Sequence, residues 1–217
     1  MNWQRARTDD KKNERKDAIY QAALSLFKEK GYEGVSFNAI ASEAGFTKSN
    51  MYRYFSSKEE IFLNIFKSLF EDWSADCTQK LQALKQNPDV SEFAQTWVAS
   101  HTPHPQFLDL TTILFISLEA NSSYEQLLEF KTRSMTLLYQ LAVEISKVYP
   151  EIEGEKAFRF LTLSFAASGN YWAAESKQND ALHKIYQLEP FKDMKPDYEK
   201  NLTASVEVII RGLLATN

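Results

Sequence analysis

Residues 36–60 read SFNAIASEAGFTKSNMYRYFSSKEE, and this stretch predicts two short helices joined by a tight turn. Ser36 can cap the first helix, because a serine side chain accepts hydrogen bonds from the free N–H groups of a first helical turn. Gly45 suits the end of that helix, because glycine adopts positive φ at little cost. Thr47 can cap the second helix in the same way as Ser36.

The second helix, predicted over 47–55, has two chemically different faces. Met51 and Phe55 lie four residues apart and are expected to point inward. The opposite face carries hydrogen-bonding and cationic side chains, namely Ser49, Asn50, Tyr52 and Arg53. This combination is typical of a helix-turn-helix, whose second helix enters a DNA major groove.

Longer helices are predicted on both sides of this motif. The first runs from near Asn13 to Lys30 and ends at Gly31, where glycine favours a helix C-terminus. The other opens with the capping box Ser57-x-x-Glu60 and continues to about residue 84. The helices up to Phe55 should share one small core formed by Ile19, Leu26, Phe27, Ile40, Met51 and Phe55.

The motif resembles the DNA-binding signature of the TetR family of bacterial transcriptional regulators. Eight residues carry the resemblance: Gly45, Thr47, Met51, Tyr52, Tyr54, Phe55, Lys58 and Glu59. The outward face departs from the family pattern at Ser49, Asn50 and Arg53, so the family does not predict the operator sequence. The resemblance implies a homodimeric regulator, most often a repressor, that a small-molecule effector releases from a palindromic operator in double-stranded DNA.

The predicted DNA contacts divide into two groups. Base or backbone readers are expected at Lys48, Ser49, Asn50, Tyr52 and Arg53, and phosphate contacts at Asn38, Tyr54 and Lys58. Lys58 lies in the first turn of its helix, where a cation opposes the helix dipole, and a nearby phosphate would offset that cost. An ordinary exposed lysine is the alternative.

Residues 1–13 are predicted to form a mobile arm. Arg5, Arg7, Lys11 and Lys12 could touch phosphate or a minor groove, although a tail without a role is the simpler interpretation.

The charge is unevenly divided along the 217 residues. The whole chain has a net charge of −4, but residues 1–58 carry 11 Lys and Arg against 7 Asp and Glu, hence +4. The remainder carries 14 against 22, hence −8. A basic head on an acidic body favours DNA binding by the head. We therefore predict a DNA-binding domain over 1–60 and an effector-binding and dimerisation domain over 61–217.

The body is expected to be helical throughout, so that the fold class is all-α. Proline and polar breaks suggest helices near 91–102, 106–119, 124–149, 155–177 and 197–215, with a long connection over 178–196.

Two of these helices have the composition of a dimer interface. Small residues at 166–169 permit close helix approach, and the last helix carries a wide apolar stripe. With the family resemblance, these features predict a four-helix interface that includes Phe165, Ser168, Gly169, Val206, Ile209, Ile210 and Leu213. The alternative is that both stripes fill the core of a monomer.

A mostly apolar effector pocket is predicted within the body. Its expected lining combines aromatic and polar residues: Trp97, His101, Phe115, Glu119, Arg133, Asn170 and Trp172. The charges of these residues do not decide whether the effector is a cation or an anion.

Other functional classes find little support. A single cysteine and three histidines argue against a metal site, and no catalytic motif or cofactor-binding motif is present. No segment is apolar enough to span a membrane, and the N-terminus lacks the apolar core of a signal peptide, so a cytoplasmic location is expected. A helical protein–protein adaptor that keeps the head fold without binding an operator remains the alternative function.

Overall fold

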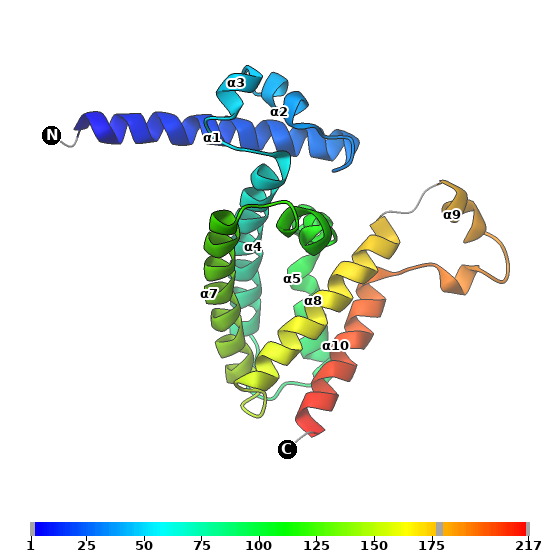
Figure 1. Cartoon of the computed structure of the whole chain (residues 1–217). Coiled ribbons are helices and arrows are strands. Elements are labelled where there is room, and N and C mark those ends of the chain that lie inside the picture. Colours follow the sequence, from blue (N-terminus) through cyan, green and yellow to red (C-terminus); the bar gives the residue numbers. More distant parts are fainter. Residues whose placement is uncertain (1–2, 177–179, 216–217) are drawn as a thin grey trace. The chain divides into compact units, whose positions relative to one another are not determined.

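A computed structural model describes residues 3–176 and 180–215, with side chains described from residue 11 onward. Within these ranges every regular element is helical, as predicted, and Figure 1 labels most of the helices. The α-helices are α1 (Trp3–Lys30), α2 (Phe37–Glu43), α3 (Lys48–Met51), α4 (Lys58–Gln82), α5 (Val90–His101), α6 (Pro105–Thr111), α7 (Tyr124–Val148), α8 (Glu155–Ser176), α9 (Asp180–Ile185) and α10 (Tyr198–Ala215). A π-helical segment, η1 (Leu114–Glu119), follows α6, and a 3-10 turn, η2 (Lys192–Met194), precedes α10.

The chain divides into two compact units. The first unit comprises Met1–Ile65 together with Phe115–Phe130, and the second comprises Phe66–Leu114 with Lys131–Asn217. The sequence-based division at residue 60 did not include 115–130 in the head. The two long helices α4 and α7 each supply residues to both units.

The first unit is built around α1, α2 and the start of α4. All six residues predicted to form its core are buried, including Ile19, Ile40 and Met51 at 0% exposure. Gly31 has a φ of +67°, and its amide donates to the Phe27 carbonyl at 2.9 Å, which confirms the predicted end of the first helix.

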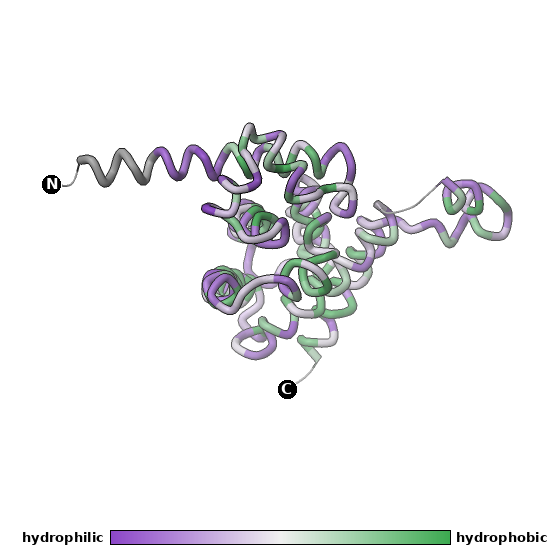
Figure 2. Tube along the Cα trace, turned by 45° about the horizontal axis from the view of Figure 1, so that its top comes forward, coloured by the Kyte–Doolittle hydropathy of each residue, from purple (hydrophilic) through white to green (hydrophobic). Residues whose placement is uncertain are grey.

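Helix α1 begins much earlier than predicted. The expected start near Asn13 is wrong, because α1 begins at Trp3. Residues 3–16 contain no glycine or proline and are rich in arginine and lysine, which favour helix even without an apolar face. In Figure 2 the coloured part of α1 begins with hydrophilic turns. The side chains of Arg5 and Arg7 lie outside the described part, and the mobility predicted for 1–13 stays a prediction.

The second unit has an aromatic core. Trp73 of α4 stacks on Phe107 of α6 with ring centroids 5.1 Å apart, and Trp97 of α5 meets Phe160 of α8 at 4.8 Å. Helix α10 packs against both α8 and α5, and Figure 1 shows α8 and α10 side by side. Phe107 and Phe160 are at most 1% exposed, so this core is densely filled.

The helix predicted over 106–119 is interrupted. Thr111 and Thr112 turn their hydroxyls back onto the carbonyls of Phe107 and Asp109, at 2.8 and 2.7 Å. Such back-bonding and the run of three β-branched residues weaken regular α-helix, so α6 ends and the π-helical η1 follows. Within the long connection predicted over 178–196, the described residues form the short helices α9 and η2.

The predicted dimer residues are largely core residues of the protomer. Val206, Ile210 and Leu213 are 0, 0 and 5% exposed. Ser168 is 1% exposed and shares a 2.9 Å hydrogen bond with the Tyr198 hydroxyl. The expectation that these four residues form the dimer interface is therefore wrong, because the stripe of α10 packs on α8 and α5 of its own chain. The other predicted residues, Phe165, Gly169 and Ile209, are half-buried.

Candidate nucleic-acid interface

Side-chain caps define both helices of the predicted helix-turn-helix. The Ser36 hydroxyl accepts from the Ala39 amide at 3.1 Å, and the Thr47 hydroxyl accepts from the Asn50 amide at 3.3 Å. Between the two helices, Gly45 has a φ of +74°. Each of these local features matches the sequence-based prediction, because each depends only on residues within one turn of the chain.

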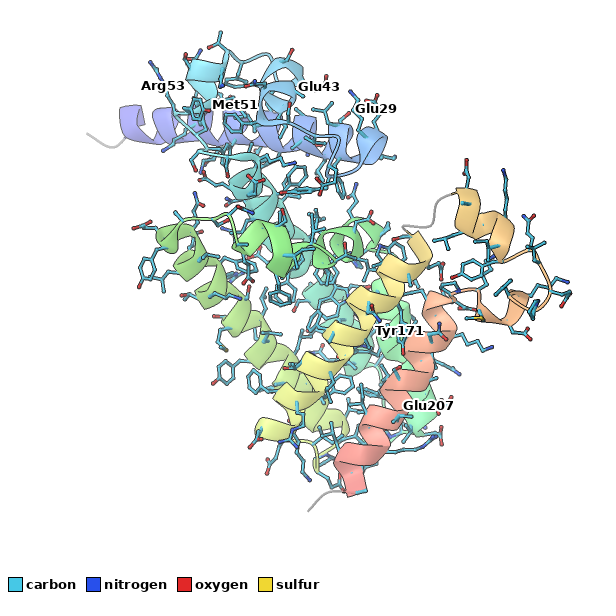
Figure 3. The ribbon with its side chains drawn as sticks, turned by 45° about the vertical axis from the view of Figure 1, so that its right-hand side comes forward. Glu29, Glu43, Met51, Arg53, Tyr171 and Glu207 are labelled. Carbon is cyan, nitrogen blue, oxygen red and sulfur yellow. The ribbon has the colours of Figure 1, made fainter. Side chains whose placement is uncertain are left out.

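The second helix is shorter than predicted. It spans only Lys48–Met51, and the amides of Arg53 and Tyr54 bond to carbonyls three residues back instead of four. The segment predicted as one helix over 47–55 therefore ends in a tight 3-10-like turn. Met51 is completely buried, whereas Arg53 is exposed, and Figure 3 shows the two side chains on this part of the head.

The predicted base readers lie together on an exposed surface. Lys48, Ser49 and Asn50 are exposed along α3, and Tyr52 and Arg53 are exposed in the turn that follows. The Tyr52 ring packs on Phe37 at 5.1 Å, which orients it while leaving 55% of the residue exposed. This surface offers hydroxyl, amide and cationic groups, which are the groups that read base edges and phosphates.

Tyr54 and Arg15 form a pair that links α1 to this surface. The Arg15 guanidinium donates to the Tyr54 hydroxyl at 3.0 Å, and this bond raises the pKa of Arg15. The Tyr54 ring also meets Phe46 at 5.9 Å. The sequence-based prediction missed Arg15. The sequence feature that could have identified Arg15 is its position four residues before Ile19, which is buried. Residues four apart on a helix lie on the same face, so Arg15 lies on the face of α1 that packs on the rest of the head.

Lys58 has local partners that differ from the predicted phosphate. Its ammonium donates to the carbonyls of Tyr32 and Val35 at 3.2 and 3.0 Å, and it lies 4.2 Å from the centroid of the Tyr32 ring. These carbonyls follow the C-terminal end of α1, where a cation is favourable. The arrangement favours a structural role for Lys58, while Asn38 is exposed on α2 and remains a candidate for phosphate contact.

Tyr32 also connects three segments of the first unit. Its hydroxyl donates to the Glu59 carboxylate at 3.1 Å and accepts from the Ser117 hydroxyl of η1 at 2.9 Å. Burial raises the pKa of the Tyr32 phenol, so the hydroxyl stays protonated. The turn after α1, the start of α4 and η1 are thereby held by one side chain.

The residues predicted to line an effector pocket are divided between the two units. Phe115 and Glu119 belong to the first unit, and the other five belong to the second. Arg133 is exposed and pairs with Glu71 at 2.6 Å, and Asn170 is exposed on α8.

Three of the predicted pocket residues have defined surroundings in the second unit. Trp97 and His101 are fully buried and in ring contact, with centroids 5.5 Å apart. The Trp172 indole donates to the Asp109 carboxylate at 3.0 Å.

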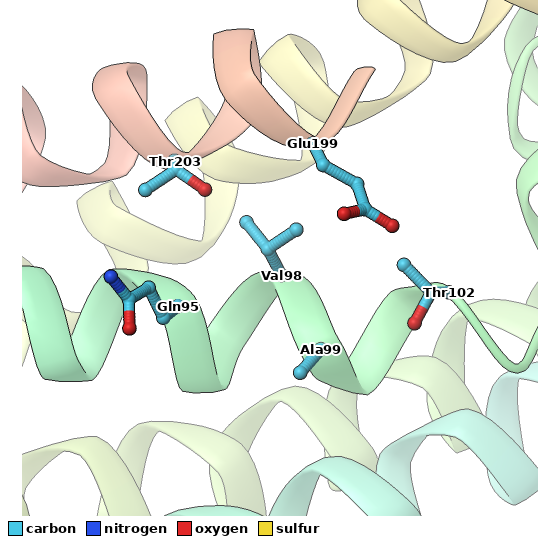
Figure 4. A pocket seen from close by; sticks show the side chains of 6 residues that line it. All are labelled: Gln95, Val98, Ala99, Thr102, Glu199 and Thr203. Carbon is cyan, nitrogen blue, oxygen red and sulfur yellow. The ribbon is translucent and has the colours of Figure 1, made fainter. Parts of the chain in front are cut away.

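Two surface pockets lie in the second unit. A small one of about 190 Å³ is lined by Gln95, Val98 and Ala99 of α5, by Thr102 directly after α5, and by Glu199 and Thr203 of α10 (Figure 4). A larger groove of about 1020 Å³ is lined by charged and polar residues near the start of α10, together with Trp172 and Glu175. The Glu175 carboxylate accepts from the Tyr198 amide in this region.

Two further features are absent from the described residues. No group of three His, Cys, Asp or Glu side chains there could hold a metal ion. None of the described helices combines the length and the apolar character needed to cross a membrane.

Two family profiles match the chain, one for each part. Residues 19–65 match the profile described as bacterial regulatory proteins, tetR family. Residues 67–217 match the profile described as tetracyclin repressor-like, C-terminal domain. The two matches together cover nearly all of the described structure.

Individual relatives match over about a quarter of the chain. The uncharacterized HTH-type transcriptional regulator YfiR of Bacillus subtilis is 38% identical over 61 residues, which is 28% of this chain and 30% of that protein. The HTH-type negative transcriptional regulator IcaR of the Staphylococcus aureus biofilm operon icaADBC is 38% identical over 56 residues, 26% of this chain and 30% of IcaR. The matched region therefore spans less than a third of these relatives.

A solved structure matches over almost the full length. The fatty acid degradation regulator FadR of Bacillus halodurans superposes with a TM-score of 0.52 over 93% of this chain and 95% of FadR, at 19% identity. At this identity the likeness describes the fold alone.

Proposed function

The chain belongs to the TetR family of bacterial regulatory proteins, and we propose that it is a sequence-specific transcriptional repressor that binds a palindromic DNA operator as a homodimer. The observation that carries the proposal is the exposed surface of Lys48, Ser49, Asn50, Tyr52 and Arg53 on a helix-turn-helix with both caps in place. A helix as short as α3 reads few bases, so a two-fold pair of heads reading two half-sites provides the specificity.

Three residues of this surface have roles that their exposure and chemistry suggest. Arg53 and Asn50 read base edges, because guanidinium and amide groups form paired hydrogen bonds with guanine and adenine. Lys48, together with Asn38 of α2, contacts phosphates. The Arg15–Tyr54 pair contributes a cation from α1 to the same side of the head.

Dimerisation is proposed through the outward faces of α8 and α10. Their inward faces fill the protomer core, so the remaining candidates are the exposed apolar residues Leu163 and Val208, which are 46 and 70% exposed. These residues lie on two helices that pack against each other. Two such pairs could form the four-helix contact predicted from the sequence.

We propose that a small-molecule effector binds the second unit and releases the DNA. The effector would favour a spacing of the two heads that no longer matches successive major grooves, roughly 34–36 Å apart. The adaptor function is not favoured, because the outward residues of the turn are hydrogen-bonding and cationic instead of apolar or acidic.

The test is selection of bound duplexes from a randomised DNA pool with the full chain at moderate salt. Enrichment of an inverted repeat is the expected result. Arg53→Ala should then relax discrimination at particular base pairs, whereas Arg159→Ala, an exposed arginine of α8, should leave the selected sequence unchanged. If the folded, dimeric protein enriches no sequence, operator binding is wrong and a protein partner becomes the better hypothesis.

A further inference from the structure

The N-terminal part of α1 extends beyond the helices on which α1 packs. No residue from 11 to 18 is buried, and Ile19 is the first residue of α1 that enters the core of the head. Figure 1 shows the early turns of α1 running past α2 and α3. An extension that buries no apolar side chain gains no stability from packing, so the head fold alone does not explain it.

The face of α1 that packs in the head is cationic in this extension. Residues three, four or seven positions apart lie on one face of a helix. Lys12, Arg15 and Lys16 precede the first buried residue by seven, four and three positions, and Lys11 borders them. Glu14 precedes it by five positions, which places this carboxylate on the opposite side of α1. We call Lys11, Lys12, Arg15 and Lys16 the cationic face of α1.

Two contacts fix the direction of the cationic face within the head. The Arg15 guanidinium donates to the Tyr54 hydroxyl at 3.0 Å. The Lys16 ammonium lies 5.7 Å from the centroid of the Phe55 ring. Both aromatic residues follow directly after Arg53, which is exposed in the turn after α3. The cationic face therefore borders the surface that is proposed to read DNA.

The cations of this face repel one another in the free protein. Lys11 and Arg15 are four residues apart on α1, and so are Lys12 and Lys16. Like charges at this spacing destabilise a helix. A polyanion beside the face removes the repulsion, and duplex DNA carries one negative charge per about 1.7 Å of its axis. The four cations extend over about 8 Å of helix at a rise of about 1.5 Å per residue, a length of duplex that carries about two phosphates on each strand.

We propose that the cationic face of α1 binds the phosphate backbone of DNA beside each half-site, outside the base pairs that α3 reads. Ammonium and guanidinium groups on phosphates position a protein on the duplex and carry no sequence information. The extension thus raises the affinity for every DNA sequence and leaves discrimination between sequences to α3 and the turn after it. This inference rests on the proposed function in one respect, namely that the head binds DNA.

The experiment measures how DNA binding by the full chain depends on salt. Fluorescence anisotropy with a labelled duplex of random sequence, between about 50 and about 200 mM salt, gives the slope of log affinity against log salt concentration. The double variant Lys11→Gln/Lys12→Gln should reduce the magnitude of this slope by about 1.8, because each neutralised phosphate contributes about 0.9. Circular dichroism should show no loss of helix, since glutamine favours helix and both like-charge pairs are removed.

Two controls locate the effect. Lys28→Gln/Lys30→Gln removes two exposed lysines from the last turn of the same helix, so it makes the same change in charge and should leave the slope unchanged. The second control shortens the selected operator to its two half-sites. On this duplex the wild type and Lys11→Gln/Lys12→Gln should bind with equal affinity, because the flanking phosphates are absent.

Three outcomes would overturn the proposal. They are an unchanged slope for Lys11→Gln/Lys12→Gln, an equal loss for Lys28→Gln/Lys30→Gln, or a loss that persists in full on the shortened operator. Any of these would leave the extension as an exposed helix without a role beside the half-sites. The titration on random duplex needs no operator, so it is decisive even if the selection enriches no sequence. An unchanged slope, in turn, leaves operator reading by α3 intact.

Discussion

Replacing Lys58 by methionine tests whether this residue stabilises the head or contacts DNA. Methionine keeps much of the aliphatic chain and removes the ammonium, which donates to the carbonyls of Tyr32 and Val35 at 3.2 and 3.0 Å. Hydrogen bonds from a charged donor contribute about 1.5–3 kcal/mol each when well buried, and this site is half-exposed. We expect the free energy of unfolding to fall by about 2 kcal/mol in total.

Two measurements distinguish the two roles of Lys58. Urea unfolding followed by circular dichroism gives the stability, and hydrogen exchange should show faster exchange of amides in the turn over 31–35. The salt dependence of DNA binding gives the number of phosphate contacts, because each neutralised phosphate contributes about 0.9 to the slope. For Lys58→Met we expect lower stability and an unchanged slope.

Lys48→Met is the matched control for this experiment. Lys48 is exposed on α3, so its replacement should change the stability by no more than about 0.5 kcal/mol. It should reduce the salt slope by about 1 if Lys48 contacts a phosphate. The structural interpretation of Lys58 would be refuted if Lys58→Met keeps full stability and loses that slope instead.

Three other outcomes are expected from single changes. Thr47→Ala should lower the free energy of unfolding by about 1 kcal/mol, because it removes the side-chain cap of α3. It should also weaken DNA binding more than it weakens effector binding. Urea unfolding and DNA titration measure these two effects, and an unchanged free energy of unfolding would contradict the prediction. Ile210→Ala should lower the free energy of unfolding by about 2–5 kcal/mol, because the side chain is fully buried. Val208→Ala should change the free energy of unfolding of the monomer by at most about 0.5 kcal/mol, because this residue is exposed. Equal effects of the two variants in urea unfolding would argue against the observed orientation of α10. The lowered pKa of His101 means that the unfolded chain binds a proton more readily than the folded chain, so stability should fall as the pH drops from about 6.5 to about 4. His101→Gln should remove part of this pH dependence, and an identical profile for the variant would exclude His101 as a source.

The accuracy of the sequence-based predictions depended on how local each feature is. The caps at Ser36 and Thr47 and the positive φ of Gly31 and Gly45 are all present, because each requires only residues within one turn. The start of α1 was missed, since Trp3 to Lys16 has helix-forming residues without an apolar stripe. Periodicity detects burial, and an exposed helical extension provides none.

The partners of individual side chains were less predictable. Lys58 was assigned to phosphate from its position at a helix start, but the carbonyls that accept its hydrogen bonds belong to a turn more than twenty residues earlier. Arg15 was overlooked because its partner Tyr54 is 39 residues away. Contacts of this kind depend on how helices cross, which no local pattern specifies.

The sequence by itself determined the helical class, the helix-turn-helix with its caps and which residues of that motif are exposed, because these depend on short-range backbone chemistry and helical periodicity. The tertiary structure decided which apolar stripes are core. It turned Val206 and Ile210 inward against the chain's own helices, and left Val208 outside, because a stripe has the same appearance in sequence whichever surface covers it. It also brought Trp73, Trp97 and His101 into one buried cluster with unsatisfied nitrogens, since α4 and α5 pack together there.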